Sequence, residues 1–145
     1  MAFKTLTPNL MVEDVSAAIA FYRDTLGFAV TGTMPAEGEG APVWASISAG
    51  DVSLMFQARH SLEEELPQLT GQPISASQTL YIGVDDADAL YEGIRSNAHI
   101  IKEPQTTFYG AREFYIQDPS GYIRGFSSSA SSASSDAADD AGSAS

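Results

Sequence analysis

The alternation of hydrophobic and polar residues divides most of the chain into two similar halves. "NLMVEDVSAAIAFYRDTLGF" and "TLYIGVDDADALYEGIRSNAHI" each combine a short apolar strand, a Val–acid–Asp turn and a helix with one apolar stripe. Val12 and Val84 open the matching turns and lie 72 residues apart. The pattern therefore predicts an internal repeat.

Both predicted helices have residues suited to their ends. Asp14 and Asp86 precede the first helical residues, where a short carboxylate caps free backbone N–H groups. Gly27 and Asn97 follow the last turns, where a residue in the left-handed conformation ends many helices. The apolar stripes recur with the helical period, and comprise Val15, Ile19, Tyr22 and Leu26 in the first helix and Ala87, Leu90, Tyr91 and Ile94 in the second.

Each helix is followed by three predicted strands. "FAVTGT" and the hairpin "VWASISAGDVSLMF" complete the first half, while "HIIKEP" and the hairpin "REFYIQDPSGYIRGF" complete the second. The hairpins turn at residues 49–51 and 118–121. The chain is thus predicted to have an α+β fold with two tandem βαβββ modules.

The module boundaries follow from these patterns. The first module is expected at residues 1–57 and the second at 78–127, with a connector at 58–77. Within the connector, Ser61 and Glu64 have the spacing of a capping box at the start of a short helix. Residues 128–145 are mostly Ser, Ala and Asp, so they are expected to form a disordered tail.

Composition narrows the range of partners. The net charge is −12, the sequence pI is about 4.2, and the five Arg and two Lys are scattered, so nucleic acid and anionic membranes are not expected partners. Because there is no cysteine, disulfides and Cys-ligated metals are excluded. No apolar run approaches the roughly 18–20 residues that cross a bilayer. We therefore expect a soluble, cytoplasmic protein.

The duplicated unit resembles the vicinal oxygen chelate superfamily, which includes glyoxalases, extradiol dioxygenases and bleomycin-resistance proteins. The resemblance covers residues 5–127, and its most specific stretches are "PNLMVEDVSAAIAFYRDTLGF" and "YGAREFYIQDPSGYIRGF". The second stretch is closest to the bleomycin-resistance branch. The resemblance implies curled mixed sheets that form a cup, with helices on the outside. Because related proteins complete their cups by pairing, and edge strands would be exposed, a homodimer is expected.

Metal-using members of this superfamily place a His, Gln or Glu near the start of the first strand of each half and a Glu on its last strand. Carried over to this chain, these positions fall on Thr7, Met55, Thr79 and Gly125. None of these side chains is a good metal ligand. His60 and His99 stand at none of the four positions. We therefore expect no metal and no cofactor.

Strand alternation predicts the residues that would line the cup. The inward residues are Asn9, Met11, Trp44 and Met55 from the first module and Tyr81, Glu113, Tyr115 and Gly125 from the second, with Phe108 and Tyr109 in a rim loop. Glu113 is a lone inward carboxylate that could attract a cation or act as a base. Alternatively, the aromatic and Met side chains could fill the cup as ordinary core.

The leading interpretation is a metal-free binding protein without catalytic residues. It would sequester an aromatic or cationic drug-like compound, because an apolar aromatic cup suits a small aromatic or amphipathic organic ligand. One alternative is a metal-dependent lyase or isomerase of the glyoxalase or dioxygenase type. The other is an interaction-only domain with a filled cup.

Overall fold

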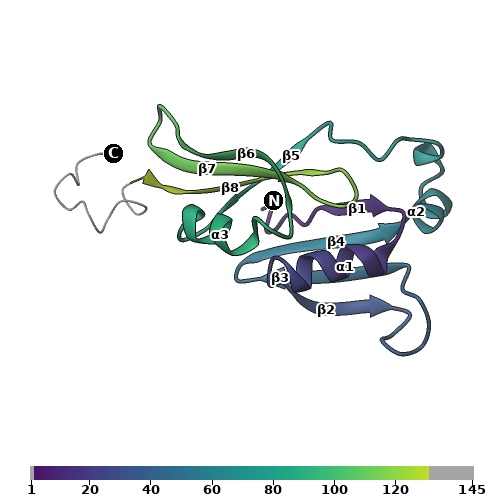
Figure 1. The fold of residues 1–145 in the computed structure, drawn as a ribbon. Helices are drawn as coiled ribbons and strands as arrows, with labels where there is room; N and C mark the ends of the chain where they lie inside the picture. Colours follow the sequence, from purple (N-terminus) through teal and green to yellow (C-terminus); the bar gives the residue numbers. More distant parts are fainter. Residues whose placement is uncertain (1, 131–145) are drawn as a thin grey trace. The chain divides into compact units, whose positions relative to one another are not determined.

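The computed structural model describes residues 2–130 and divides the chain into two compact units, one ending at Ile74 and the other beginning at Ser75. Each unit contains one four-stranded sheet (Figure 1). The first unit consists of β1 (Asn9–Val12), α1 (Val15–Asp24), β2 (Ala29–Met34), β3 (Trp44–Ala49), β4 (Val52–Ala58), α2 (Arg59–Glu65) and the 3₁₀ helix η1 (Pro67–Leu69). The second consists of β5 (Thr79–Gly83), α3 (Ala87–Ile94), β6 (His99–Thr106), β7 (Ala111–Gln117) and β8 (Ile123–Ser129). The predicted α+β fold with two βαβββ modules is confirmed.

The two sheets have equivalent topologies. Strand order is β1-β4-β3-β2 in the first unit and β5-β8-β7-β6 in the second. In each unit the first strand pairs in parallel with the last one, and the other pairs are antiparallel. The internal repeat seen in the sequence is therefore a repeat of the whole strand arrangement.

The predicted helix starts are confirmed. The side chain of Asp14 accepts a hydrogen bond from the backbone N–H of Ala17, and Asp86 does the same for Ala89, each at 3.1 Å. Each carboxylate thus satisfies a backbone donor that has no partner within its helix. Gly27, after α1, has the predicted positive φ, of 81°.

Two local predictions were wrong. Among residues 2–130 no residue other than glycine has a positive φ, so Asn97 does not end α3 in the left-handed conformation. Its N–H instead donates to the Ile94 carbonyl at 2.8 Å, which closes a tighter turn. The capping box is also absent: α2 begins at Arg59, which places Ser61 inside the helix, and its N-cap makes no side-chain hydrogen bond.

Each long helix covers one face of its own sheet (Figure 1). Aromatic side chains make much of the contact. On α1, Tyr22 is 1% exposed and its ring packs against Phe28 and Phe56. On α3, Tyr91 meets Phe114 of β7, which in turn contacts Phe126 of β8. Because alternate residues of a strand point to opposite faces, this packing leaves the other face of each sheet for a different role.

The turn between β7 and β8 is held by a buried carboxylate. Oδ1 of Asp118 accepts hydrogen bonds from the N–H groups of Ser120 and Tyr122, both at 2.9 Å. Its Oδ2 lies 3.4 Å from Nη2 of Arg124, and the two side chains are 2% and 1% exposed. Asp118 therefore connects the turn to a buried cation on β8.

The end of β8 differs from the expected boundary. The strand continues through Ser129, two residues into the segment assigned to the tail. The N–H of Ala130 then donates to the Gly110 carbonyl at 3.0 Å. The remainder of the predicted tail, 131–145, lies outside the described residues. Within residues 2–130, none of the helices has the length and hydropathy needed to cross a membrane.

Substitutions at Asp118 should separate the role of its charge from its role in the turn. Asp118→Ala removes both and leaves Arg124 buried without this counter-charge, so the free energy of unfolding should fall by about 3 kcal/mol. Asp118→Asn keeps an oxygen acceptor for the turn and should cost distinctly less. Urea denaturation of the three proteins measures the difference. A loss below about 1 kcal/mol for the Ala variant would show that the ion pair does not stabilise the fold.

Candidate ligand-binding site

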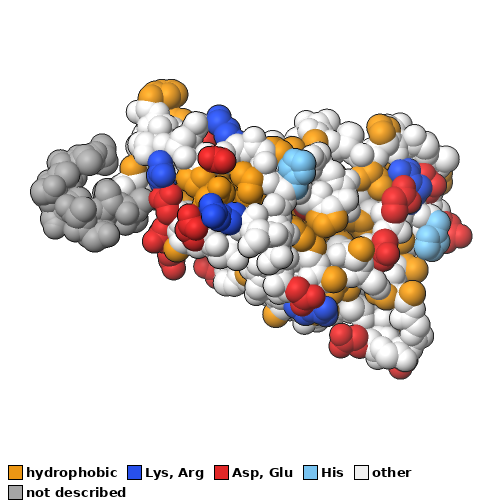
Figure 2. Space-filling view, in the orientation of Figure 1, with side chains coloured by type: hydrophobic (Ala, Val, Ile, Leu, Met, Phe, Trp, Pro, Cys, Tyr) orange, Lys and Arg blue, Asp and Glu red, His pale blue; other side chains and the backbone are white. Residues whose placement is uncertain are grey.

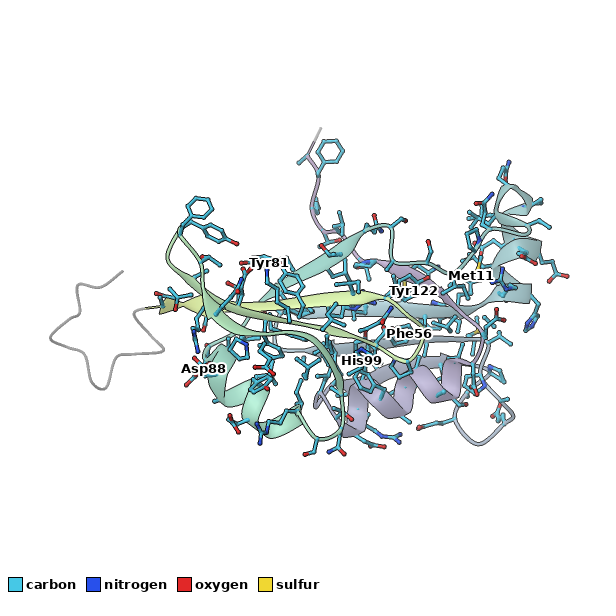
Figure 3. All side chains as sticks on the ribbon, turned by 45° about the horizontal axis from the view of Figure 1, so that its top comes forward. Met11, Phe56, Tyr81, Asp88, His99 and Tyr122 are labelled. Atoms are coloured by element: carbon cyan, nitrogen blue, oxygen red, sulfur yellow. The ribbon has the colours of Figure 1, made fainter. Side chains whose placement is uncertain are left out.

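Three neighbouring strands of the second unit bring four of the predicted site residues to one sheet face. Tyr81 of β5 pairs with Gly125 of β8, and Gly125 pairs on its other side with Tyr115 of β7. Glu113 precedes Tyr115 by two positions and therefore shares its face. Figure 3 shows Tyr81 on one side of this sheet and Asp88 of α3 on the other. The candidate site thus lies on the face opposite the helix.

Glu113 is the chemical centre of this face. Glu113 is only 4% exposed. Its Oε1 atom accepts hydrogen bonds from the hydroxyl groups of Tyr81 at 2.6 Å and Tyr109 at 2.9 Å. The hydrogen bond to Glu113 raises the pKa of Tyr81 to about 12, because it favours the protonated phenol. Two tyrosine hydroxyl groups thus lie within hydrogen-bonding distance of the carboxylate that the strand period predicts to point inward.

The charge of Glu113 is not paired with the neighbouring arginine. Arg112 points to the helix side, where Nε and Nη2 contact the Asp88 carboxylate at 2.9 and 3.0 Å. None of the ion pairs within the described part of the chain includes Glu113. The donors to this carboxylate are therefore neutral phenols rather than a cation.

Gly125 is required by the ring of Tyr115. A Cβ atom at position 125 would lie 2.6 Å from Cε2 and 3.0 Å from Cζ of that ring, which is closer than carbon atoms approach. Burial, together with the nearby charge of Glu113, raises the pKa of Tyr115. The position that lacks a metal ligand in the sequence is thus occupied in space by an aromatic ring.

The turn between β6 and β7 delivers Tyr109 to the site but leaves Phe108 outside it. Gly110 has a φ of 85°, and its N–H donates to the Thr107 carbonyl at 3.1 Å. Phe108 is 99% exposed and meets the Tyr109 ring edge-on, with centroids 5.0 Å apart. Hydrophobic side chains stand out at the tip of this turn in Figure 2. Of the two residues predicted in the rim loop, Tyr109 therefore contacts Glu113, whereas Phe108 points into solvent.

The corresponding face of the first unit carries amide chemistry instead. Asn9 of β1 pairs with Met55, and Trp44 pairs with Gln57 of β4, so these four residues share a face. Nδ2 of Asn9 donates to Oε1 of Gln57 at 2.9 Å. Met11, two positions after Asn9, is buried.

Gln57 was missed by the sequence reasoning. Its Nε2 donates to Oγ of Ser61 at 3.0 Å and to Oε1 of Glu65 at 2.9 Å, which ties α2 to the sheet. The strand period could have identified it, because Gln57 follows Met55 by two positions. The first unit therefore presents amide side chains on its sheet face, and the carboxylate in their network comes from Glu65 of α2 rather than from a strand.

The residues present do not fit a metal. Within residues 2–130, no three His, Asp or Glu side chains come together as a metal-binding group. His60 lies in α2 of the first unit, whereas His99 begins β6 of the second. The side chains of Thr7, Met55 and Thr79 offer no carboxylate or imidazole, and Gly125 has no side chain.

A separate pocket of about 270 Å³ lies in the first unit, beside α1 and the segment after β2. Its lining includes Ile19, Arg23, Thr33 and Pro35, and none of the predicted site residues. The guanidinium of Arg23 is already engaged by Asp24 at 2.8 Å. The sheet face around Glu113 is therefore the stronger candidate for a site.

Comparisons with known proteins agree with the duplicated fold. A model of the glyoxalase/bleomycin resistance protein/dioxygenase superfamily matches residues 4–123. An uncharacterized protein of Mycobacterium bovis is 25% identical over 125 residues, which cover 81% of this chain and 78% of the relative.

Solved structures extend the comparison. The bleomycin-binding protein of Streptomyces verticillus, in complex with copper(II)-bleomycin, is similar with a TM-score of 0.61 and 24% identity over 87% of this chain and 96% of that one. TnmS3, an antibiotic-binding protein from a Streptomyces species, has a TM-score of 0.67 and 23% identity over 89% and 98%. At these identities the likeness concerns the fold.

Replacement of Gly125 by Ala should test the contact with the Tyr115 ring. We expect the added methyl group to lower the free energy of unfolding by about 1–3 kcal/mol, because the ring must move to admit it. In a Tyr115→Ala background the same substitution should cost less than about 1 kcal/mol. A double-mutant cycle by chemical denaturation measures this coupling. If the losses of stability caused by Gly125→Ala and Tyr115→Ala simply add in the double variant, the proposed contact between position 125 and the ring is absent.

Proposed function

Because the chain belongs to the glyoxalase/bleomycin resistance protein/dioxygenase superfamily, we propose that it binds a small, positively charged aromatic compound without the aid of a metal. The observation that carries this proposal is the Glu113 carboxylate, which is nearly buried and receives hydrogen bonds from two tyrosines rather than from a cation. The proposed site lies on the sheet face of the second unit.

The physical basis of the proposal is the combination of one negative charge with aromatic rings. Tyr81, Tyr109 and Tyr115 surround the carboxylate, and Tyr81 and Tyr109 are 51% and 58% exposed. Attraction between a cation and an aromatic face contributes roughly 0.5–2 kcal/mol, and a charged hydrogen bond to a carboxylate contributes a similar amount. A planar cation would obtain both kinds of interaction at once.

Sequestration is favoured over catalysis by the same residues. The positions at which metal-using relatives place ligands hold Thr7, Met55, Thr79 and Gly125, and the ring of Tyr115 lies over the last of them. The similar structures include a bleomycin-binding and an antibiotic-binding protein. We therefore assign this chain to the ligand-holding rather than the metal-using type of superfamily member.

A matched series of naphthalene derivatives tests the proposed function. Naphthylmethylammonium should bind at least about tenfold more tightly than naphthoate, with the neutral alcohol in between, because charge is the main difference among them. Glu113→Gln keeps the shape and removes the charge, so it should abolish most of this preference. Isothermal titration of both proteins gives the affinities, and circular dichroism confirms that the variant is folded. Equal affinities for cation and anion in the parent protein would reject the proposal.

We further propose that the chain forms a homodimer. Strands β1, β2, β5 and β6 are the edges of their sheets, and such edges are commonly covered by association. Light scattering at micromolar concentration should therefore give twice the chain mass of 15.3 kDa. A measured mass equal to that of one chain would contradict the dimer while leaving the ligand site untouched.

A further inference from the structure

The two tyrosines that donate to Glu113 are anchored in different ways. Tyr81 belongs to β5, where the pairing with Gly125 fixes its backbone, and its hydroxyl lies 2.6 Å from Oε1. Tyr109 belongs to the turn before β7, and its longer hydrogen bond of 2.9 Å ends on the same oxygen. Tyr109 is therefore the more readily displaced of the two donors.

Release of Tyr109 would require movement of its side chain only. The turn backbone is held by hydrogen bonds from Thr107 N–H to the Ala111 carbonyl at 2.8 Å and from Gly110 N–H to the Thr107 carbonyl at 3.1 Å. The Tyr109 ring is 58% exposed, so a change of rotamer would carry its hydroxyl into water. The phenol would then exchange its bond to Glu113 for bonds to solvent.

Resting on the proposed function, we propose that Tyr109 is a specificity-determining residue that competes with the ligand for the Glu113 carboxylate. A cation with N–H groups can replace the Tyr109 hydroxyl by donating its own hydrogen bond to the carboxylate. A quaternary ammonium has no such donor and leaves Tyr109 in place. Tyr109 thereby weakens the preference of the site for protonated amines and guanidinium groups, since these cations must displace its hydroxyl and fully alkylated cations need not.

The matched variants Tyr109→Phe and Tyr81→Phe distinguish a competitor from a fixed part of the site. Each removes one hydroxyl donor to the same oxygen and keeps the ring. Tyr109→Phe should increase the affinity for naphthylmethylammonium by about tenfold, because the ligand no longer has to break a hydrogen bond to a charged group. Tyr81→Phe should change this affinity much less, since the Tyr81 hydroxyl is retained in both the free and the bound states.

Isothermal titration of the parent and both variants uses naphthylmethylammonium and its N,N,N-trimethyl analogue as probes. The expected result is tighter binding of the primary amine to Tyr109→Phe, with the affinity for the trimethyl analogue unchanged. Unchanged or weaker binding of the primary amine to Tyr109→Phe, with a loss on Glu113→Gln, would overturn the role of Tyr109 but preserve the proposed function. Failure of both cations to bind the folded parent protein would overturn both.

Discussion

The contact between Gly125 and the ring of Tyr115 is the constraint on which the candidate site depends. Tyr115 of β7 pairs directly with Gly125 of β8, so the ring can lie over the glycine only in this strand register. A shift of one residue would turn Glu113 toward the helix and bring Phe114 to the site face. Asp118 supports this register from the end of the hairpin, because its side chain orders the turn that joins the two strands.

The duplication allowed two faces to acquire different chemistry on one scaffold. Asn9 and Tyr81 lie at matching positions of the first strands, and their partners on the last strands are Met55 and Gly125. In the first unit the amide of Asn9 donates to Gln57, which in turn donates to the Glu65 carboxylate of α2. In the second unit the phenol of Tyr81 supports a carboxylate. The backbone arrangement is shared, whereas the carboxylate comes from a strand in the second unit and from helix α2 in the first.

The fold could be predicted because it follows from local and periodic signals. The strand period placed Glu113 and Tyr115 on one face and Phe114 on the other, and the structure agrees. Asp14 and Asp86 act as predicted because an N-cap depends on residues only a few positions away. The prediction that Asn97 ends α3 in the left-handed conformation was wrong, because a tighter turn can also end a helix.

The contacts of the site were less predictable because they depend on distant segments. Tyr109 reaches Glu113 only through a turn that requires a positive φ at Gly110. The role of Gln57 depends on where α2 lies, which the sequence pattern did not specify. Gly125 was interpreted as a missing ligand, since the ring that fills its space comes from another strand.

The ring over Gly125 also constrains the order in which this site could change during evolution. A glutamate at position 125 would have to place its first side-chain carbon among atoms of the Tyr115 ring. That substitution alone should be selected against for its effect on folding, whatever its benefit for metal binding. Earlier replacement of Tyr115 would lower this cost, but it would remove an aromatic ring from the present site. The two residues are therefore expected to be epistatic, because a side chain at position 125 should cost less stability once the Tyr115 ring is gone.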